Sequence, residues 1–113
     1  MPIITVSHKE TAPTELLNRL RQRLPDIVSR AVACDEEPYD GRLRPGDVNM
    51  RLLSALPDDE ALDVLIEVRT KWHESRSDDL QERSDSIKSA LGELGLKDFG
   101  VWVELVRAAW SQD

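Results

Sequence analysis

Pro2 is the residue of this chain whose type and position most clearly suggest a catalytic role. If Met1 is removed, which a small second residue permits, the chain begins with a secondary amine that belongs to no peptide bond. Such a nitrogen can act as a base near neutral pH when burial and nearby cations destabilise its protonated form. The alternative is that Pro2 only stiffens the start of a strand. Position alone leaves both interpretations open.

Several basic side chains fall where they could serve an anionic substrate. Arg69 and Lys71 share one face of a predicted strand, and Arg51 lies on the equivalent face of a predicted neighbour. A cluster of this kind would orient a carboxylate and would depress the pKa of a nearby ammonium group. Glu67 and Asp63 fall on the same face as Arg69, so the cations equally fit cross-strand ion pairs.

The first half of the chain must position Pro2. β-branched residues over 3–7 predict an opening strand. An apolar stripe over 14–33 then predicts a helix, which Pro25 should kink or divide in two. Residues 35–47 are rich in turn formers and predict a long loop.

The second half repeats this plan. Alternation over 48–53 and 62–71 predicts two strands, joined as a hairpin through the turn at 57–60. A second helix is expected from the N-cap Ser77 to a stop at Gly95, followed by a fourth strand. The last strand covers 99–106. We therefore expect residues 1–113 to form one α+β domain of order β-α-β-β-α-β, with two helices on a four-stranded sheet.

Composition excludes several classes of partner. The chain has 113 residues with 15 basic and 22 acidic side chains, a net charge of -7, which argues against nucleic acid and anionic membranes. No apolar run is long enough to span a bilayer, and the start is too soon polar for a signal peptide. The lone Cys34 suits the reducing cytoplasm. Because His8, His73 and Cys34 lack the spacing of zinc ligands, we expect no metal and no cofactor.

The order of motifs along nearly the whole chain resembles the tautomerase superfamily. The matching segments are the opening Met1-Pro2-Ile3-Ile4, a helix of about twenty residues, Pro45-x-Asp47-Val48, Arg69-Thr70-Lys71 with Ser75-Arg76-Ser77-Asp78-Asp79-Leu80, and Phe99-Gly100-Val101-Trp102-Val103-Glu104. Members include 4-oxalocrotonate tautomerase, 5-carboxymethyl-2-hydroxymuconate isomerase, malonate semialdehyde decarboxylase and macrophage migration inhibitory factor. The resemblance implies a homotrimer with a β-barrel-like centre. It also implies a proline nitrogen that interconverts enol and keto forms of a small 2-oxo or 2-hydroxy acid.

The resemblance assigns roles residue by residue. Pro2 matches the catalytic base, and Arg69 and Arg76 match arginines that bind a substrate carboxylate. Lys9 stands just after the first strand, where some members carry a cation, and Trp102 stands where an aromatic wall is expected. Each of these side chains has a structural alternative as an ion-pair, core or interface residue.

Glu104 lies two residues from Trp102 and so shares its face. An acidic residue activates water in relatives that hydrate unsaturated acids, so Glu104 leaves a hydratase, dehalogenase or decarboxylase activity open. A third hypothesis is a ferredoxin-like binding module without catalysis, because a fold alone does not determine function.

Overall fold

The computed structural model describes residues 1–44 and 46–113, and its elements follow the predicted order. The strands are β1 (Ile3–His8), β2 (Asn49–Ser54), β3 (Val64–Lys71) and β4 (Phe99–Val106). The helices are α1 (Thr14–Val32), α2 (Glu74–Asp78) and α3 (Leu80–Glu93). The α+β prediction is confirmed, with the short α2 added before the second long helix.

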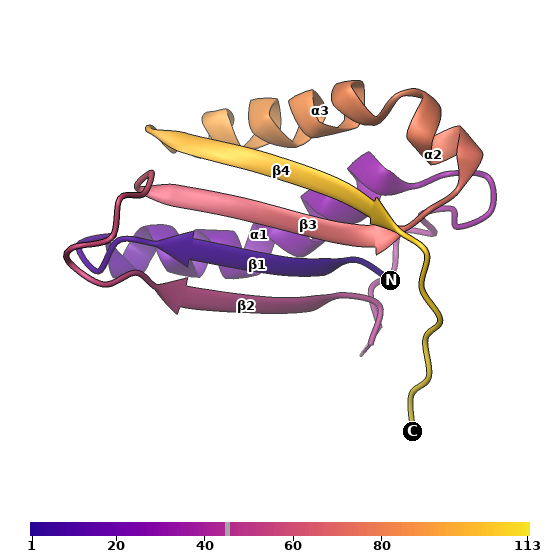
Figure 1. Ribbon diagram of the computed structural model, residues 1–113, viewed down its shortest axis with the longest axis horizontal. Coiled ribbons are helices and arrows are strands. Elements are labelled where there is room, and N and C mark those ends of the chain that lie inside the picture. The colour runs from indigo at the N-terminus through magenta and orange to yellow at the C-terminus, as the bar shows by residue number, and fades with distance from the viewer. Residues whose placement is uncertain (45) are drawn as a thin grey trace.

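The four strands form one mixed sheet of order β2-β1-β3-β4 (Figure 1). β1 pairs with β2 and β3 with β4 in parallel, whereas β1 and β3 are antiparallel. The predicted hairpin between β2 and β3 is therefore wrong, because β1 lies between these two strands. Arg51 faces Thr5 of β1 and does not border the strand that carries Arg69 and Lys71.

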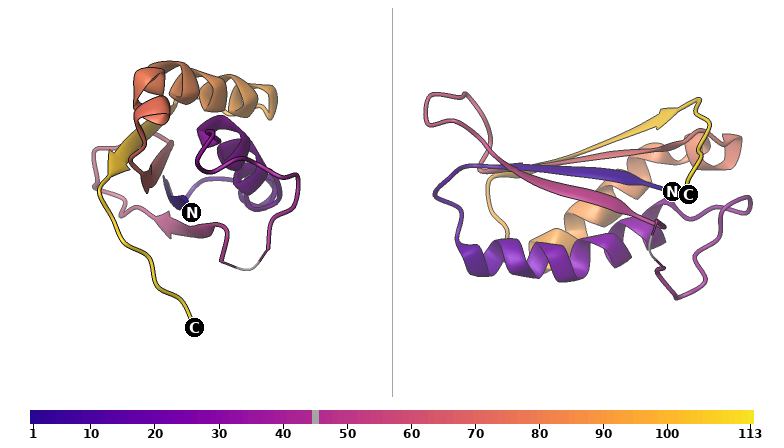
Figure 2. Two further views of the ribbon diagram at one scale, coloured as in Figure 1. Left: turned by 90° about the vertical axis from the view of Figure 1, so that its right-hand side faces the viewer. Right: turned by 90° about the horizontal axis from the view of Figure 1, so that it is seen from below.

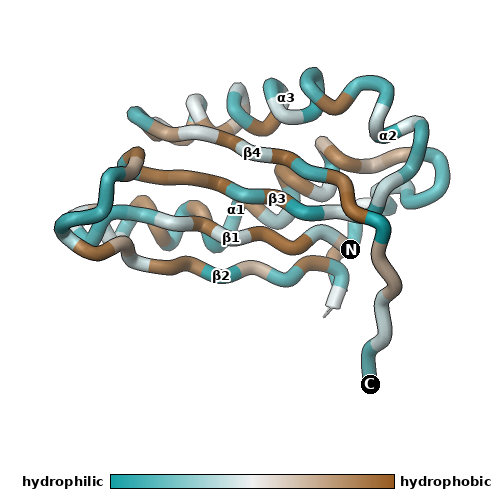
Figure 3. Tube along the Cα trace, in the orientation of Figure 1, coloured by the Kyte–Doolittle hydropathy of each residue, from teal (hydrophilic) through white to brown (hydrophobic). Residues whose placement is uncertain are grey.

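Both long helices cover the same face of the sheet, as the view from below shows (Figure 2). Alternate residues of β1 and β3 point into this layer, where burial of each large apolar side chain stabilises the fold by about 1.5–3 kcal/mol. The buried apolar residues are Ile4, Val6, Leu20, Leu24, Val28, Val32, Val64, Ile66, Val68, Ile87, Leu91 and Leu96. Hydrophobic stretches along the strands are visible in Figure 3.

The opposite face of the sheet is not covered by a helix. It carries apolar side chains that remain in contact with solvent, among them Ile3, Leu53 and Trp102, which are 41%, 50% and 61% exposed. A sheet face of this composition is suited to contact with another protein surface.

The helices differ from expectation at two points. Pro25 was expected to kink α1 or divide it in two, and α1 runs from Thr14 to Val32 as one helix, so the division is wrong. Ser77 lies inside α2 and is not the cap of the second long helix, which begins after Asp79, a residue with φ of -127° and ψ of 33°. Gly95 adopts a φ of 90° just beyond α3, in agreement with the predicted stop.

The topology gathers several chain segments at one end of the sheet. β1 and β2 begin there, β3 and β4 end there, and α1 ends and α2 begins nearby (the right-hand end in Figure 1). Both termini lie at this end as well. Among the described residues, no helix combines the length and the apolar character needed to cross a membrane.

Candidate functional site

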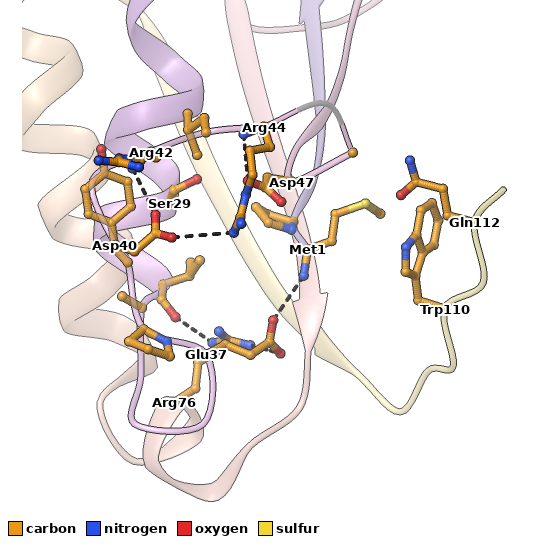
Figure 4. A pocket seen from close by; sticks show the side chains of 17 residues that line it. Met1, Ser29, Glu37, Asp40, Arg42, Arg44, Asp47, Arg76, Trp110 and Gln112 are labelled. Atoms are coloured by element: carbon orange, nitrogen blue, oxygen red, sulfur yellow. Dashed lines mark hydrogen bonds and ion pairs between the residues drawn. The ribbon is translucent and has the colours of Figure 1, made fainter.

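A pocket of about 320 Å³ opens at this end of the sheet (Figure 4). Its walls come from the start of β1, the end of α1, the loop between α1 and β2, the helix α2 and the carboxyl-terminal tail. The residues that line it are Met1, Pro2, Ser29, Val32, Ala33, Glu37, Pro38, Tyr39, Asp40, Arg42, Leu43, Arg44, Gly46, Asp47, Arg76, Trp110 and Gln112.

Pro2 is buried at the wall of this pocket. Its carbonyl oxygen accepts a hydrogen bond from the backbone N–H of Asn49 at 3.1 Å, which ties it to the start of β2. With Met1 attached, the Pro2 nitrogen is an amide. The free amine of Met1 then lies 3.1 Å from Oε2 of Glu37.

Glu37 is the acidic group nearest the amino terminus, and the sequence analysis assigned it no role. Its Oε1 lies 2.9 Å from Nε2 of His73 and 3.6 Å from Nη1 of Arg76. Two backbone hydrogen bonds with Cys34, at 3.0 and 3.1 Å, hold the turn that carries it. Burial raises the pKa of Glu37, but the hydrogen bonds from His73 and the amino terminus outweigh it and hold the pKa at about 2. The carboxylate is therefore ionised at neutral pH.

Arg76 is a buried guanidinium, only 1% exposed, between α1 and β3. Nε donates to the carbonyl oxygen of Val32 at 2.7 Å, and Nη1 donates to the carbonyl oxygen of Lys71 at 2.6 Å and to Thr70 at 3.2 Å. For Nη2, the described residues supply no hydrogen-bond partner. Arg76 is one of the residues that line the pocket. Arg76 thus anchors the fold and brings a buried positive charge to the wall of the pocket.

The remaining charges of the pocket largely neutralise one another. Arg44 lies 3.4 Å from Asp40 and 3.5 Å from Asp47, and these pairs brace the loop before β2. A backbone hydrogen bond from Arg44 lowers the pKa of Asp47, which keeps that carboxyl ionised. In the predicted motif Pro45-x-Asp47-Val48, Pro45 lies outside the described residues, whereas Asp47 lines the pocket.

Arg69, Trp102 and Glu104 form a separate cluster on the uncovered face of the sheet. Nε of Arg69 donates to Oε1 of Glu104, and Nε1 of Trp102 lies 3.5 Å from the other carboxylate oxygen. The hydrogen bond from Arg69 lowers the pKa of Glu104. These three residues do not line the pocket around Pro2. Within one chain, Arg69 and Glu104 are a cross-strand ion pair. Arg69 pairs in register with Ile3, the residue after Pro2, but does not line the pocket.

Lys9 lies at the opposite end of the sheet. It follows β1, and its Nζ is 3.1 Å from Oδ1 of Asp63. Pro2 precedes the same strand, so the rise of about 3.3 Å per residue puts roughly 20 Å between them. Within one chain Lys9 and Pro2 therefore do not share a pocket, and the substrate-binding role of Lys9 stays a prediction. In the part of the chain that the structure describes, no three His, Cys, Asp or Glu side chains could together hold a metal ion.

No protein-family model matches the chain, and no curated protein matches its sequence. Solved structures match it over most of its length. A malonate semialdehyde decarboxylase aligns with a TM-score of 0.67 at 14% identity, over 96% of this chain and 88% of the other. A fused 4-OT wild-type asymmetric trimer aligns with a TM-score of 0.58 at 12% identity, over 93% and 86%. A 5-carboxymethyl-2-hydroxymuconate isomerase from Deinococcus radiodurans aligns with a TM-score of 0.56 at 17% identity, over 99% and 89%.

The chain has the tautomerase-superfamily fold. The fold that the resemblance implied from sequence is thereby confirmed. At these identities the match concerns the fold, and the activities named for these proteins are their own.

Proposed function

We propose that the protein is an enzyme that interconverts enol and keto forms of a small 2-oxo or 2-hydroxy acid. In this proposal Met1 is removed and the nitrogen of Pro2 is the general base. The supporting observation is that Pro2 lines a pocket of about 320 Å³ whose wall includes the buried guanidinium of Arg76. A pocket of this size suits a small acid.

The proposed chemistry needs only groups that the chain supplies. The Pro2 nitrogen accepts a proton from an atom next to the substrate carbonyl and returns it at another atom, so that substrate and product are isomers. Nη2 of Arg76 would donate to the substrate carboxylate. A charge-assisted hydrogen bond inside a partly dehydrated pocket is stronger than one in water, which favours Arg76 over the exposed Arg69 for this role.

The same pocket supports a second candidate function, in which the enzyme decarboxylates or hydrates its substrate. The observation that favours it is the ionised carboxylate of Glu37, 3.1 Å from the amine of Met1. If the Pro2 nitrogen takes the place of that amine, Glu37 stabilises its protonated form, whereas the charge of Arg76 destabilises it. A protonated Pro2 would serve as an acid that polarises the substrate carbonyl, and Glu37 replaces Glu104 as the acidic partner in this scheme.

We also propose that the chain assembles as a homotrimer. The uncovered sheet face with Ile3, Leu53 and Trp102 supports an association, and three matched structures are described as trimers of fused 4-OT. Sedimentation velocity at micromolar concentration is expected to give the mass of three chains.

The experiment that tests the proposed function compares the wild type with Pro2→Ala. Intact mass first establishes that each protein has lost Met1, since retention leaves an amide nitrogen without a basic lone pair. Ketonisation of phenylenolpyruvate and 2-hydroxymuconate is then followed by absorbance. We expect kcat/KM to fall by about 10²- to 10⁴-fold in Pro2→Ala. Equal rates in the two proteins would remove Pro2 from the mechanism.

A further inference from the structure

The short helix α2 and His73, the residue before it, form side-chain hydrogen bonds with the acidic turn that carries Glu37. Oγ of Ser75 donates to Oε2 of Glu36 at 2.8 Å, and Nε2 of His73 lies 2.9 Å from Oε1 of Glu37. In Figure 4, Arg76 lies on one side of the Glu37 carboxylate and the Met1 amine on the other. The carboxylate thus has one oxygen turned toward α2 and one toward the amino terminus.

His73 is the principal donor that orients this carboxylate. Nη1 of Arg76 is 3.6 Å from Oε1, beyond hydrogen-bond distance. It already donates to the carbonyl oxygen of Lys71 and to Oγ1 of Thr70. The imidazole of His73 is only 21% exposed, so water competes weakly for its N–H. Because a glutamate side chain has three rotatable bonds, loss of the His73 hydrogen bond frees the carboxylate to turn away from the amino terminus.

We infer that His73 is a positioning residue that holds Oε2 of Glu37 against the amino-terminal nitrogen. This inference rests on the second candidate function, decarboxylation or hydration, since Glu37 matters to the reaction only if a protonated Pro2 nitrogen works beside it. His73 acts through Glu37 and does not touch the substrate. The role requires that Nε2 carries a hydrogen, whether the imidazole is neutral or protonated.

The turn itself does not depend on His73. The paired backbone hydrogen bonds between Cys34 and Glu37, and the contact of Ser75 with Glu36, remain when the imidazole is removed. A substitution at His73 therefore frees the Glu37 side chain and leaves the path of the chain in place, which makes a clean test possible.

The test uses two variants of the processed protein. His73→Leu removes the donor, and His73→Gln restores one because its side-chain nitrogen reaches the position of Nε2. Carboxyl ¹³C NMR titration of Glu37 needs no substrate. We expect a higher Glu37 pKa in His73→Leu and a return toward the wild-type value in His73→Gln. In an assay of decarboxylation or hydration, where protonated Pro2 is the acid, kcat is expected to fall about tenfold in His73→Leu because Pro2 loses the carboxylate that favours its protonated form. KM is expected to stay within twofold, because Arg76 still binds the substrate carboxylate. His73→Gln should recover most of the loss.

Several results would overturn the inference. One is an unchanged Glu37 pKa in His73→Leu. Another is a His73→Gln variant in which neither the Glu37 pKa nor kcat returns toward the wild-type value. A third is an effect of His73→Leu on KM alone, with kcat unchanged. If neither variant folds, the tautomer of His73 in the wild type decides the matter: ¹⁵N NMR must show a hydrogen on Nε2, and an unprotonated Nε2 refutes the role. Wild-type protein without turnover but with the expected Glu37 titrations would count against the proposed function and not against the contact between His73 and Glu37.

Discussion

Replacing Glu37 by glutamine should make the stability of the protein respond less to acid. The pKa of Glu37 is about 2 in the folded chain, about 2.5 below its ordinary value of 4.5. At 1.36 kcal/mol per unit this corresponds to at most about 3.4 kcal/mol of stability. The side chain is 33% exposed, so solvent screening reduces the expected value to about 1–2 kcal/mol.

The sign follows from the depressed pKa. A carboxyl group that binds its proton less readily when folded stabilises the native state above pH 4.5, and this contribution is lost as the pH falls through about 2. We therefore expect Glu37→Gln to be less stable than the wild type by about 1–2 kcal/mol at pH 7. The difference should shrink toward zero near pH 2.

Urea unfolding followed by tryptophan fluorescence at pH 7, 4 and 2.5 measures this difference, with both chains retaining Met1 and held at one concentration. Glu15→Gln is a matched control, since Glu15 is 81% exposed and, among the residues that the structure describes, pairs only with Arg19 on the surface of α1. We expect the control to follow the wild type at each pH. Equal stabilities of Glu37→Gln and wild type at pH 7, or a difference that does not depend on pH, would refute the reasoning.

Three further outcomes are expected. Arg76→Met should lower Tm by more than about 10 °C in calorimetry, because it leaves the carbonyl oxygens of Val32 and Lys71 without their donor; a shift of less than a few degrees would contradict this anchoring role. Lys9→Ala should leave kcat/KM for phenylenolpyruvate within twofold of the wild type, since Lys9 pairs with Asp63 far from Pro2; a tenfold loss would place it in the site. Leu24→Ala should cost about 2–5 kcal/mol in urea unfolding, because Leu24 is fully buried under the sheet, and a cost below 1 kcal/mol would mean that the core is not packed there.

Local periodicity predicted most of the secondary structure. The alternation of Val64, Ile66 and Val68 with polar neighbours identified both β3 and the face that it buries, and Gly95 marked the end of α3 through its positive φ. These signals are local, because each depends on a side chain and its immediate neighbours.

The sequence was a poorer guide to which strands lie next to one another in the sheet. A hairpin between β2 and β3 satisfies the turn signal at 57–60, yet β1 occupies the position between them. That arrangement arises from a parallel pairing of β1 with β2 across the whole of α1, and no short stretch of sequence encodes such a long-range contact.

The candidate site was predicted in part. Pro2 and Arg76 line one pocket, whereas Arg69 belongs to the uncovered sheet face and Lys9 to the far end of the sheet. Glu37 and His73 were missed because they lie in irregular segments 36 residues apart. The signal that could have identified these two residues is the topology. In two β-α-β units joined by an antiparallel strand pair, the loop after α1, which carries Glu37, and the segment after β3, which carries His73, meet at one end of the sheet.

The most direct test of the account is a ¹⁵N NMR titration of Pro2 in the processed protein labelled with ¹⁵N-proline. The other prolines are amides and do not titrate, so a free Pro2 gives a single secondary-amine signal that moves with pH. We expect the pKa read from this signal to be lower in Glu37→Gln than in the wild type, and to stay unchanged in Glu104→Gln, whose carboxylate pairs with Arg69 on the uncovered sheet face. A Pro2 signal that remains an amide, or a pKa equal in wild type and Glu37→Gln, would contradict the account.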